Sequence, residues 1–348
     1  MDNFLISSNN KSKTVDGLKG IAICGVVMFH LLSYFFHVPD IIKIMANFGG
    51  AGVHVFLICS GFGLAYSYRL KEFKFISFFI NRFIKIYIPY IIIIFISFFV
   101  ISLYDAPDRV PALLSHIFLI KMFVPKYENS FGLQFWYIST IFQFYLSFGI
   151  LLKIKRKLGN RRYIIGAICI NLVWSTIITY LGIYEERVFN SFFLQYLWEF
   201  CIGMCIADYY AREKKLPIDL INWYWILFAS ILSCIIYASM ALTGGALKNY
   251  NDAFSVISFG GVCILILRVT VFEKIFVWIN GISYEMYLTH ILIFTLIIKG
   301  TEEILPNTIS TILSLLILLV ISYIYHQIIS VRLVQFIRNN IVGNKILE

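Results

Sequence analysis

The chain has 348 residues, of which 60% are hydrophobic, 18% aromatic and only 14% charged, and its formal net charge is +10. Its mean hydropathy is +0.82. Soluble globular domains carry far more charge, so this composition excludes a string of soluble domains and favours one integral membrane domain. The basic excess does not indicate nucleic-acid binding, because the cations lie in short clusters between apolar stretches and form no basic face.

The apolar stretches are long enough to cross a bilayer as helices, which takes about 20 residues. The first follows a polar N-terminal segment and has no small-residue cleavage site after it, so we expect it to be retained as a span. The predicted fold class is therefore all-α integral membrane, with about ten transmembrane helices. The predicted spans are 15–36, 47–67, 83–103, 132–152, 163–182, 190–210, 222–242, 252–270, 280–299 and 308–330.

Three parts of the chain follow from these spans. Residues 1–14 form a cytoplasmic N-terminal segment, 15–330 the transmembrane domain, and 331–348 a cytoplasmic C-terminal tail. The apolar piece 112–123 is too short to cross and contains His116 and Lys121, so we predict a re-entrant or interfacial segment.

The distribution of cations predicts the orientation. With ten spans, 22 of the Lys and Arg residues fall on the side of the termini and 7 on the opposite side. Cytoplasmic loops retain positive charge, so both termini are predicted to be cytoplasmic.

All seven cysteines fall inside apolar stretches, which predicts no disulfide. Cys201 and Cys205 lie one helical turn apart, but no second pair of ligands completes a zinc site, so we expect no metal.

Ionisable residues inside the spans are costly, and each is a candidate functional group. In VDGLKGIAICGVVMFH (15–30), Lys19 and His30 are eleven residues apart, about three helical turns, so they share one helix face about 16 Å apart along the axis. Lys19 taken alone is compatible with a lysine that extends to the interface, and His30 with a histidine bonded to a neighbouring helix. Their common face favours one shared cavity.

Other polar residues form a second set of candidates. Arg82 and Lys85 lie three apart at the predicted inner end of the third span, where a cation pair suits either phosphate binding or simple retention of positive charge inside. Ser60 lacks the strand and turn that surround a nucleophile elbow, and the glycines beside it favour close helix packing. The remaining candidates are Asp16, His54, Trp136, Gln143, Tyr145, Glu199, Tyr284 and His290.

Six motifs in order resemble the membrane-bound acyltransferase family 3, the integral acyltransferases that O-acylate cell-surface carbohydrates. VDGLKGIAICGVVMFH resembles the family's opening signature and GVHVFLICSGFGL its second span. NRFIKIYIPY is similar to its basic motif and FWYISTIFQFYL to its Trp and Gln-Phe-Tyr span. FCIGMCIA and ISYEMYLTHI resemble its two late motifs.

The resemblance implies transfer of an acyl group, usually acetyl, from cytoplasmic acyl-CoA to a hydroxyl of a glycan or an isoprenoid-linked sugar across a bacterial plasma membrane. His30 would be the catalytic histidine, as general base or as acyl carrier. Lys19, Arg82 and Lys85 would bind the CoA phosphates. The other motif residues, Asp16, His54, Ser60, Trp136, Gln143, Tyr145, Tyr284 and His290, would contact substrate or support the site.

The chain departs from the family pattern at three places. Lysine stands at 19 and 85 where arginine is usual or frequent, which keeps the charge but loses the two-pronged donor of arginine. His54 replaces a frequent carboxylate, so Glu199 becomes the speculative partner of His30. Ile141 and Phe142 stand where many family members have a Glu pair. Those family members often have an extra extracytoplasmic domain.

Two other functions fit the same polar-lined spans. One is a transporter or flippase for a small anion or a lipid-linked sugar, although no inverted repeat is visible in the hydropathy. The other is a subunit that passes acyl groups to a separate transferase.

Overall fold

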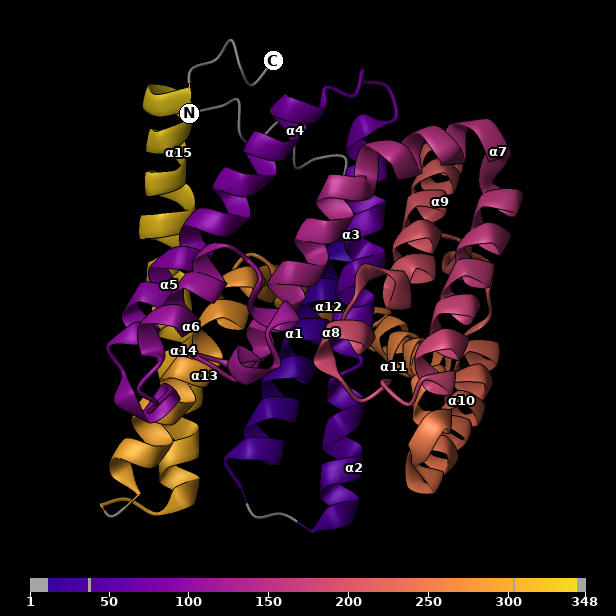
Figure 1. The fold of residues 1–348 in the computed structure, drawn as a ribbon. Coiled ribbons are helices and arrows are strands. Elements are labelled where there is room, and N and C mark those ends of the chain that lie inside the picture. The colour runs from indigo at the N-terminus through magenta and orange to yellow at the C-terminus, as the bar shows by residue number, and fades with distance from the viewer. Residues whose placement is uncertain (1–11, 37–38, 303, 343–348) are drawn as a thin grey trace. The chain divides into compact units, whose positions relative to one another are not determined.

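The computed structural model describes residues 12–36, 39–302 and 304–342. Every regular element in these residues is a helix and none is a strand, which confirms the all-α class. The chain divides into two compact units, and Figure 1 labels the helices of both. The first unit comprises Met1–Cys59 and Glu213–Tyr284, and the second Ser60–Arg212 and Glu285–Glu348. Residues 1–11 of the predicted N-terminal segment and 343–348 of the predicted tail lie outside the described residues.

The first unit is built mainly from helices that pack around the first one. The bounds are α1 (Lys13–Tyr34), α2 (Asp40–Gly49), the beginning of α3 (Gly52–Tyr68), α10 (Trp223–Thr243), α11 (Asp252–Leu267) and α12 (Thr270–Asn280), with 3₁₀ turns at Pro217–Leu220 and Gly245–Tyr250. Helix α1 contacts α2, α11 and α12, and α10 packs along α11. The predicted site residues Lys19 and His30 therefore lie on the central helix of this unit.

The second unit contains the rest of α3 and most of the remaining helices. These are α4 (Phe75–Arg82), α5 (Ile88–Phe98), α6 (Arg109–Ile117), α7 (Trp136–Tyr180), α8 (Arg187–Asn190), α9 (Leu197–Glu213), α13 (Ser283–Ile298), α14 (Asn307–Tyr325) and α15 (Val334–Ile337). Three π-helical stretches join or extend them: Phe83–Tyr87, His326–Leu333 and Arg338–Val342. Short 3₁₀ turns occur at Ile101–Leu103, Lys121–Phe123, Pro125–Tyr127, Leu133–Phe135, Phe193–Tyr196 and Lys299–Thr301.

Each of the ten predicted spans overlaps one of these helices. Among the described residues, six helices are long and apolar enough to cross a membrane, or up to seven if α11 and α12 form one bent span. Helix α7 is counted once, yet Gly159 (φ 72°) interrupts it inside the predicted joint 153–162. Helices α9 and α13 have 17 and 16 residues, slightly under a full span. The count of ten and the cytoplasmic termini stay predictions.

Three boundaries differ from the sequence prediction. The predicted span 252–270 ends at Leu267, and α12 turns away from it by 115°, an element that the sequence pattern did not reveal. The third span begins at Phe75 rather than 83, because the helix continues through Arg82 and Lys85. The last helix continues from α14 to Val342, through most of the predicted tail. At the start of the third span and the end of the last one, the helix continues through charged residues.

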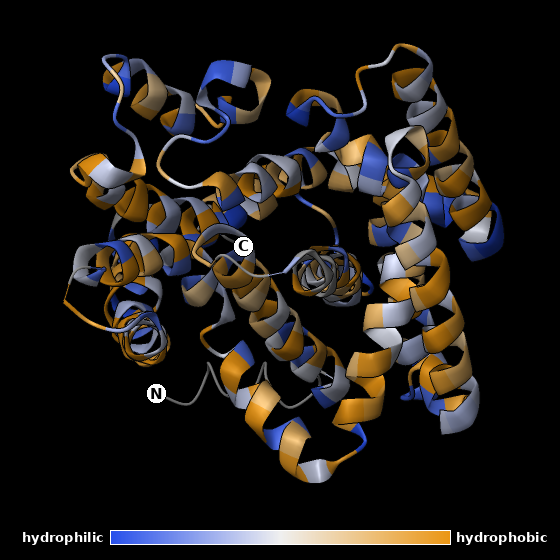
Figure 2. Ribbon diagram, turned by 90° about the horizontal axis from the view of Figure 1, so that it is seen from below, coloured by the Kyte–Doolittle hydropathy of each residue, from blue (hydrophilic) through white to orange (hydrophobic). Residues whose placement is uncertain are grey.

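Helix α10 has polar residues on its buried face and apolar residues on its exposed face. It buries Ser230 and Ser233 against the protein, whereas Phe228 and Ile235 are 58% and 59% exposed. A surface helix of a soluble protein has the opposite pattern. Membrane proteins typically place small polar residues where helices contact one another and apolar residues on the outer face. Hydrophobic residues (orange in Figure 2) accordingly run along the helices without being confined to one inner stripe.

Glycines allow close approach of helix backbones in both units. A Cβ atom at Gly20 would lie 1.9 Å from the carbonyl oxygen of Phe276, so α1 and α12 pack with no side chain between them. In the second unit, a Cβ atom at Gly61 would lie 2.1 Å from the carbonyl oxygen of Phe200. This agrees with the packing role that the sequence predicted for the Gly-rich span.

The Gly20→Ala substitution is expected to destabilise the protein by about 1–3 kcal/mol, because a methyl group there forces α1 away from α12. Gly260→Ala is the matched control in the same unit, since nothing among the described residues lies within 4 Å of the added Cβ. Thermal unfolding in detergent measures both. A Gly20→Ala protein as stable as the control would contradict the close packing of these helices.

A buried hydrogen-bonded network holds the segment between α6 and α7. The Tyr90 hydroxyl donates to His116 Nδ1 (2.7 Å), and His116 Nε2 donates to the carbonyl oxygen of Ser130 (3.1 Å). Lys121 Nζ donates to the carbonyl oxygens of Ser130 (3.2 Å) and Gly132 (2.6 Å). Burial lowers the pKa of His116 well below its ordinary value, which keeps the ring neutral. Burial, with the positive charge of Arg187, likewise lowers the pKa of Lys121.

Because the network satisfies buried polar groups, the Tyr90→Phe substitution is expected to cost about 1–3 kcal/mol of stability. The change leaves His116 Nδ1 without its donor at a position that is 0% exposed. Tyr180→Phe, at a side chain that is 88% exposed, serves as the control and should change stability by only a few tenths of a kcal/mol. Equal melting temperatures for the two variants would show that the network contributes nothing.

Candidate functional site

Helix α1 carries Asp16, Lys19 and His30 in the first unit. The helix is continuous from Lys13 to Tyr34, so the geometry that the eleven-residue spacing predicts for Lys19 and His30 applies. Lys19 Nζ lies 3.9 Å from Asp16 Oδ1, and about a quarter of each side chain is exposed. The two charges therefore partly compensate one turn inside the start of the helix, while His30 lies three turns further along.

The hydrogen bond of His30 shows which ring nitrogen carries a proton. Its side chain is buried, and Nδ1 lies 2.9 Å from the carbonyl oxygen of Val26. A carbonyl oxygen only accepts, so Nδ1 carries the proton, and a neutral ring then has its lone pair on Nε2. The ring also packs against Phe29 and Tyr34, with centroids 4.8 Å and 5.9 Å away. This arrangement suits a group that accepts a proton or an acyl group through Nε2.

His54, at the start of α3, has a carboxylate neighbour that the sequence analysis missed. Its Nε2 lies 3.7 Å from Asp252 Oδ1, in the first turn of α11, and both side chains are partly buried. The two residues are nearly 200 positions apart, so no local spacing signals the pair. Tyr284, the other predicted residue of this unit, is partly buried in the first turn of α13.

The predicted cation pair of the second unit lies at the junction of α4 with the π-helical stretch Phe83–Tyr87. Arg82 ends α4, and its guanidinium lies 5.8 Å from the centre of the Phe78 ring. The Phe78 ring in turn packs edge to face on Tyr145 at 6.1 Å. Lys85 lies within the π-helical stretch and is exposed. The structure thus brings Arg82 close to Tyr145, and π-helical turns are frequent at functional sites.

Trp136 and Gln143 connect α7 to the segment before α9. The Trp136 ring stacks on Tyr196 at 5.9 Å, and the Arg187 guanidinium lies 5.5 Å from the ring centre. Gln143 Oε1 accepts a hydrogen bond from the backbone N–H of Phe193 at 3.3 Å. Both residues therefore position the 187–196 segment, and Arg187 is a neighbour that the sequence analysis did not find.

The remaining predicted residues of the second unit lie on three different helices. Glu199 is fully buried in the first turn of α9. His290 is fully buried on α13, where Nδ1 donates to the carbonyl oxygen of Met286 at 3.0 Å. Ser60 is partly buried within α3, a helical position without an elbow. The pairing of Glu199 with His30 stays a prediction.

One further pair escaped the sequence analysis. The buried Glu285 Oε1 lies 3.0 Å from His326 Nδ1, which joins α13 to the π-helical stretch after α14. The two residues are 41 positions apart, so no local spacing signals the pair.

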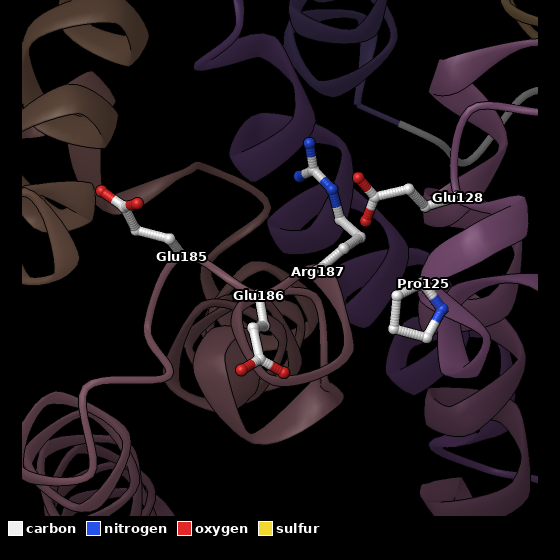
Figure 3. Close-up of a pocket in the computed structure, with 5 residues that line it drawn as sticks. All are labelled: Pro125, Glu128, Glu185, Glu186 and Arg187. Carbon is white, nitrogen blue, oxygen red and sulfur yellow. The ribbon is translucent and has the colours of Figure 1, made fainter.

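A surface pocket of about 300 Å³ lies beside the Trp136 cluster. Its lining contains Glu128, Glu185, Glu186 and Arg187, together with Pro125. The Arg187 guanidinium and the Glu128 carboxylate lie toward the same space, whereas Glu186 points away from them (Figure 3). None of the sequence-predicted site residues lines this pocket.

Comparison with protein families gives one match, an acyltransferase domain of the acyltransferase 3 type, which covers residues 13–327. Comparison with curated proteins and with solved structures gave no match. The matched region includes His30 and its helix, the Arg82 junction, and the helices that carry Trp136, Glu199 and His290. The apolar helices agree with this assignment. The chain therefore belongs to the acyltransferase 3 family and is a multi-pass membrane acyltransferase.

Proposed function

We propose that this protein transfers an acyl group, acetyl in the simplest case, from cytoplasmic acyl-CoA to a hydroxyl of an extracytoplasmic or lipid-linked glycan. The cell membrane of a bacterium is the proposed location. The family supplies the reaction class. The donor, the acceptor and the orientation are parts of the proposal.

The hydrogen bond of His30 Nδ1 is the observation that carries this proposal. With Nδ1–H bonded to the Val26 carbonyl oxygen, Nε2 is the nitrogen with a lone pair. In direct transfer, Nε2 takes the proton of the acceptor hydroxyl as its oxygen attacks the thioester carbon, and the CoA thiolate leaves. In two-step transfer, Nε2 itself attacks, the thiolate leaves, and the acyl-imidazole then passes its acyl group to the hydroxyl.

The cations supply the proposed donor site. The phosphates of CoA are recognised by charge-assisted hydrogen bonds, which Lys and Arg provide. Lys19 lies three helical turns before His30 on α1, about 16 Å away along the axis. That separation suits the extended pantetheine arm between the phosphates and the thioester. Arg82 and Lys85 are the other cations that we propose to bind the CoA phosphates.

His30→Asn is expected to reduce acyl transfer by about 10²- to 10⁴-fold, because the amide N–H can replace Nδ1–H but no basic nitrogen remains. The assay follows label from acetyl-CoA into the lipid and polysaccharide fractions of membrane vesicles. Met28→Leu, at an exposed position of the same helix, is the control and should retain wild-type transfer. A His30→Asn rate equal to that of the control would remove the proposed mechanism.

Lys19→Ala is expected to raise KM for acetyl-CoA about tenfold, which corresponds to the loss of one charge-assisted hydrogen bond. Lys19→Arg should keep KM near or below that of the wild type, since it preserves the charge and restores a two-pronged donor. Lys13→Ala, at an exposed position of the same helix, is the control. An unchanged KM in both Lys19 variants would show that this end of α1 does not bind the donor.

A further inference from the structure

The last helix of the chain extends beyond both the family match and the thickness of a bilayer. Residues Asn307–Asn340 form one helical segment of 34 residues, whereas the match ends at residue 327. At 1.5 Å per residue the segment is about 50 Å long, against about 30 Å for the hydrocarbon core. Its last turns therefore reach the aqueous side, and they carry Arg332 and Arg338.

Arg338 is held at the junction that carries Arg82 and Lys85. Its Nη2 donates to Asn81 Oδ1 at 2.9 Å. Asn81 Nδ2 donates to the Ser77 carbonyl oxygen at 2.8 Å, so its oxygen faces the arginine. Helix α15 packs against the π-helical stretch Phe83–Tyr87, and α14 and α15 run beside α4 and α5 in Figure 1. Asn81 immediately precedes Arg82 and lies about one turn before Lys85, which places three cations around one junction.

The two arginines at this junction, Arg82 and Arg338, have no carboxylate partner among the described residues. Arg82 contacts the face of Phe78 instead. The Nε atom of Arg338 is enclosed and has no hydrogen-bond partner in the described part of the chain. A buried donor without a partner is costly, so its retention favours a ligand that accepts hydrogen bonds.

Retention of positive charge on the cytoplasmic side does not explain Arg338. Such residues extend freely into water or headgroups. Arg338 instead points at a fixed side-chain oxygen with its Nε enclosed. Arg332, six residues earlier on the same helix and exposed, fits the simple retention of charge.

We infer that Arg338 binds a phosphoryl group of the acyl-CoA donor, together with Arg82 and Lys85. Phosphate oxygens accept hydrogen bonds from guanidinium nitrogens, and Arg338 has one terminal nitrogen besides the Nη2 that bonds Asn81. This inference rests on the proposed function and adds to it a donor-binding residue outside the family match.

Kinetics with two donors test the inference. Arg338→Gln should raise KM for acetyl-CoA about tenfold, leave kcat within about twofold, and leave KM for acetyl-pantetheine, which lacks the nucleotide phosphates, unchanged. The KM of Arg338→Lys for acetyl-CoA should lie between those of the wild type and Arg338→Gln. The KM of Arg332→Gln should equal that of the wild type. A purely structural role would change both donors equally, and that result, or no change with either donor, would overturn the inference.

Direct binding separates this inference from the proposed function. CoA and dephospho-CoA are titrated against the purified wild-type and Arg338→Gln proteins, both checked for a single monodisperse species. Weaker CoA binding by the variant supports the inference even if the wild type transfers no acyl group. The absence of CoA binding by the wild type would overturn it. A variant that binds CoA normally but loses its response to phosphatidylglycerol in nanodiscs would show that Arg338 binds a lipid headgroup instead.

Discussion

The cost of placing polar groups in an apolar solvent is the constraint on which this structure depends. Backbone N–H and C=O groups satisfy one another within helices, which explains why the described residues contain helices and no strands. The side chains are arranged in the opposite way to those of a soluble protein. Serines of α10 and α14 face the protein, while large apolar residues face outward. Buried polar side chains such as His116 and Lys121 are hydrogen-bonded to specific partners.

The same constraint limits how the chemistry can be arranged. A charged nucleotide does not enter the hydrocarbon core, so the proposed donor must bind by its phosphates at the aqueous end and extend its acyl group inward. A neutral His30 ring would suit this environment, since its Nδ1 proton is used by a backbone carbonyl and no buried charge would be needed at rest. The cations proposed to bind the donor are Lys19 on α1 and Arg82, Lys85 and Arg338 in the second unit.

Hydropathy predicted the helical class and the positions of the spans, because apolar length is a local property of the sequence. It did not predict α12, whose 115° bend from α11 depends on packing against α1 at Gly20. Helical structure also extends beyond the predicted bounds 83 and 330, where Arg82 contacts Phe78 and Arg338 bonds Asn81. Helix ends depend on such distant partners as much as on local charge.

Only those features of the candidate site that lie within one helix were predictable from the sequence. The shared face of Lys19 and His30 follows from spacing on one helix, and the structure keeps that helix continuous. The partners of the other polar residues were not predictable, since Asp252 beside His54, His326 beside Glu285 and Tyr90 beside His116 are distant in sequence. The motifs identified residues through family resemblance, but only the fold supplies their neighbours.

The central claim is that the acyl group passes from a donor on the cytoplasmic side to an acceptor on the opposite side through His30. The most direct measurement uses sealed, inside-out membrane vesicles, with labelled acetyl-CoA added outside and the acceptor glycans enclosed. The account predicts that labelled product accumulates inside the wild-type vesicles and that His30→Asn vesicles form none. Product that forms only on the side of the donor, or equally in the His30→Asn vesicles, would contradict it.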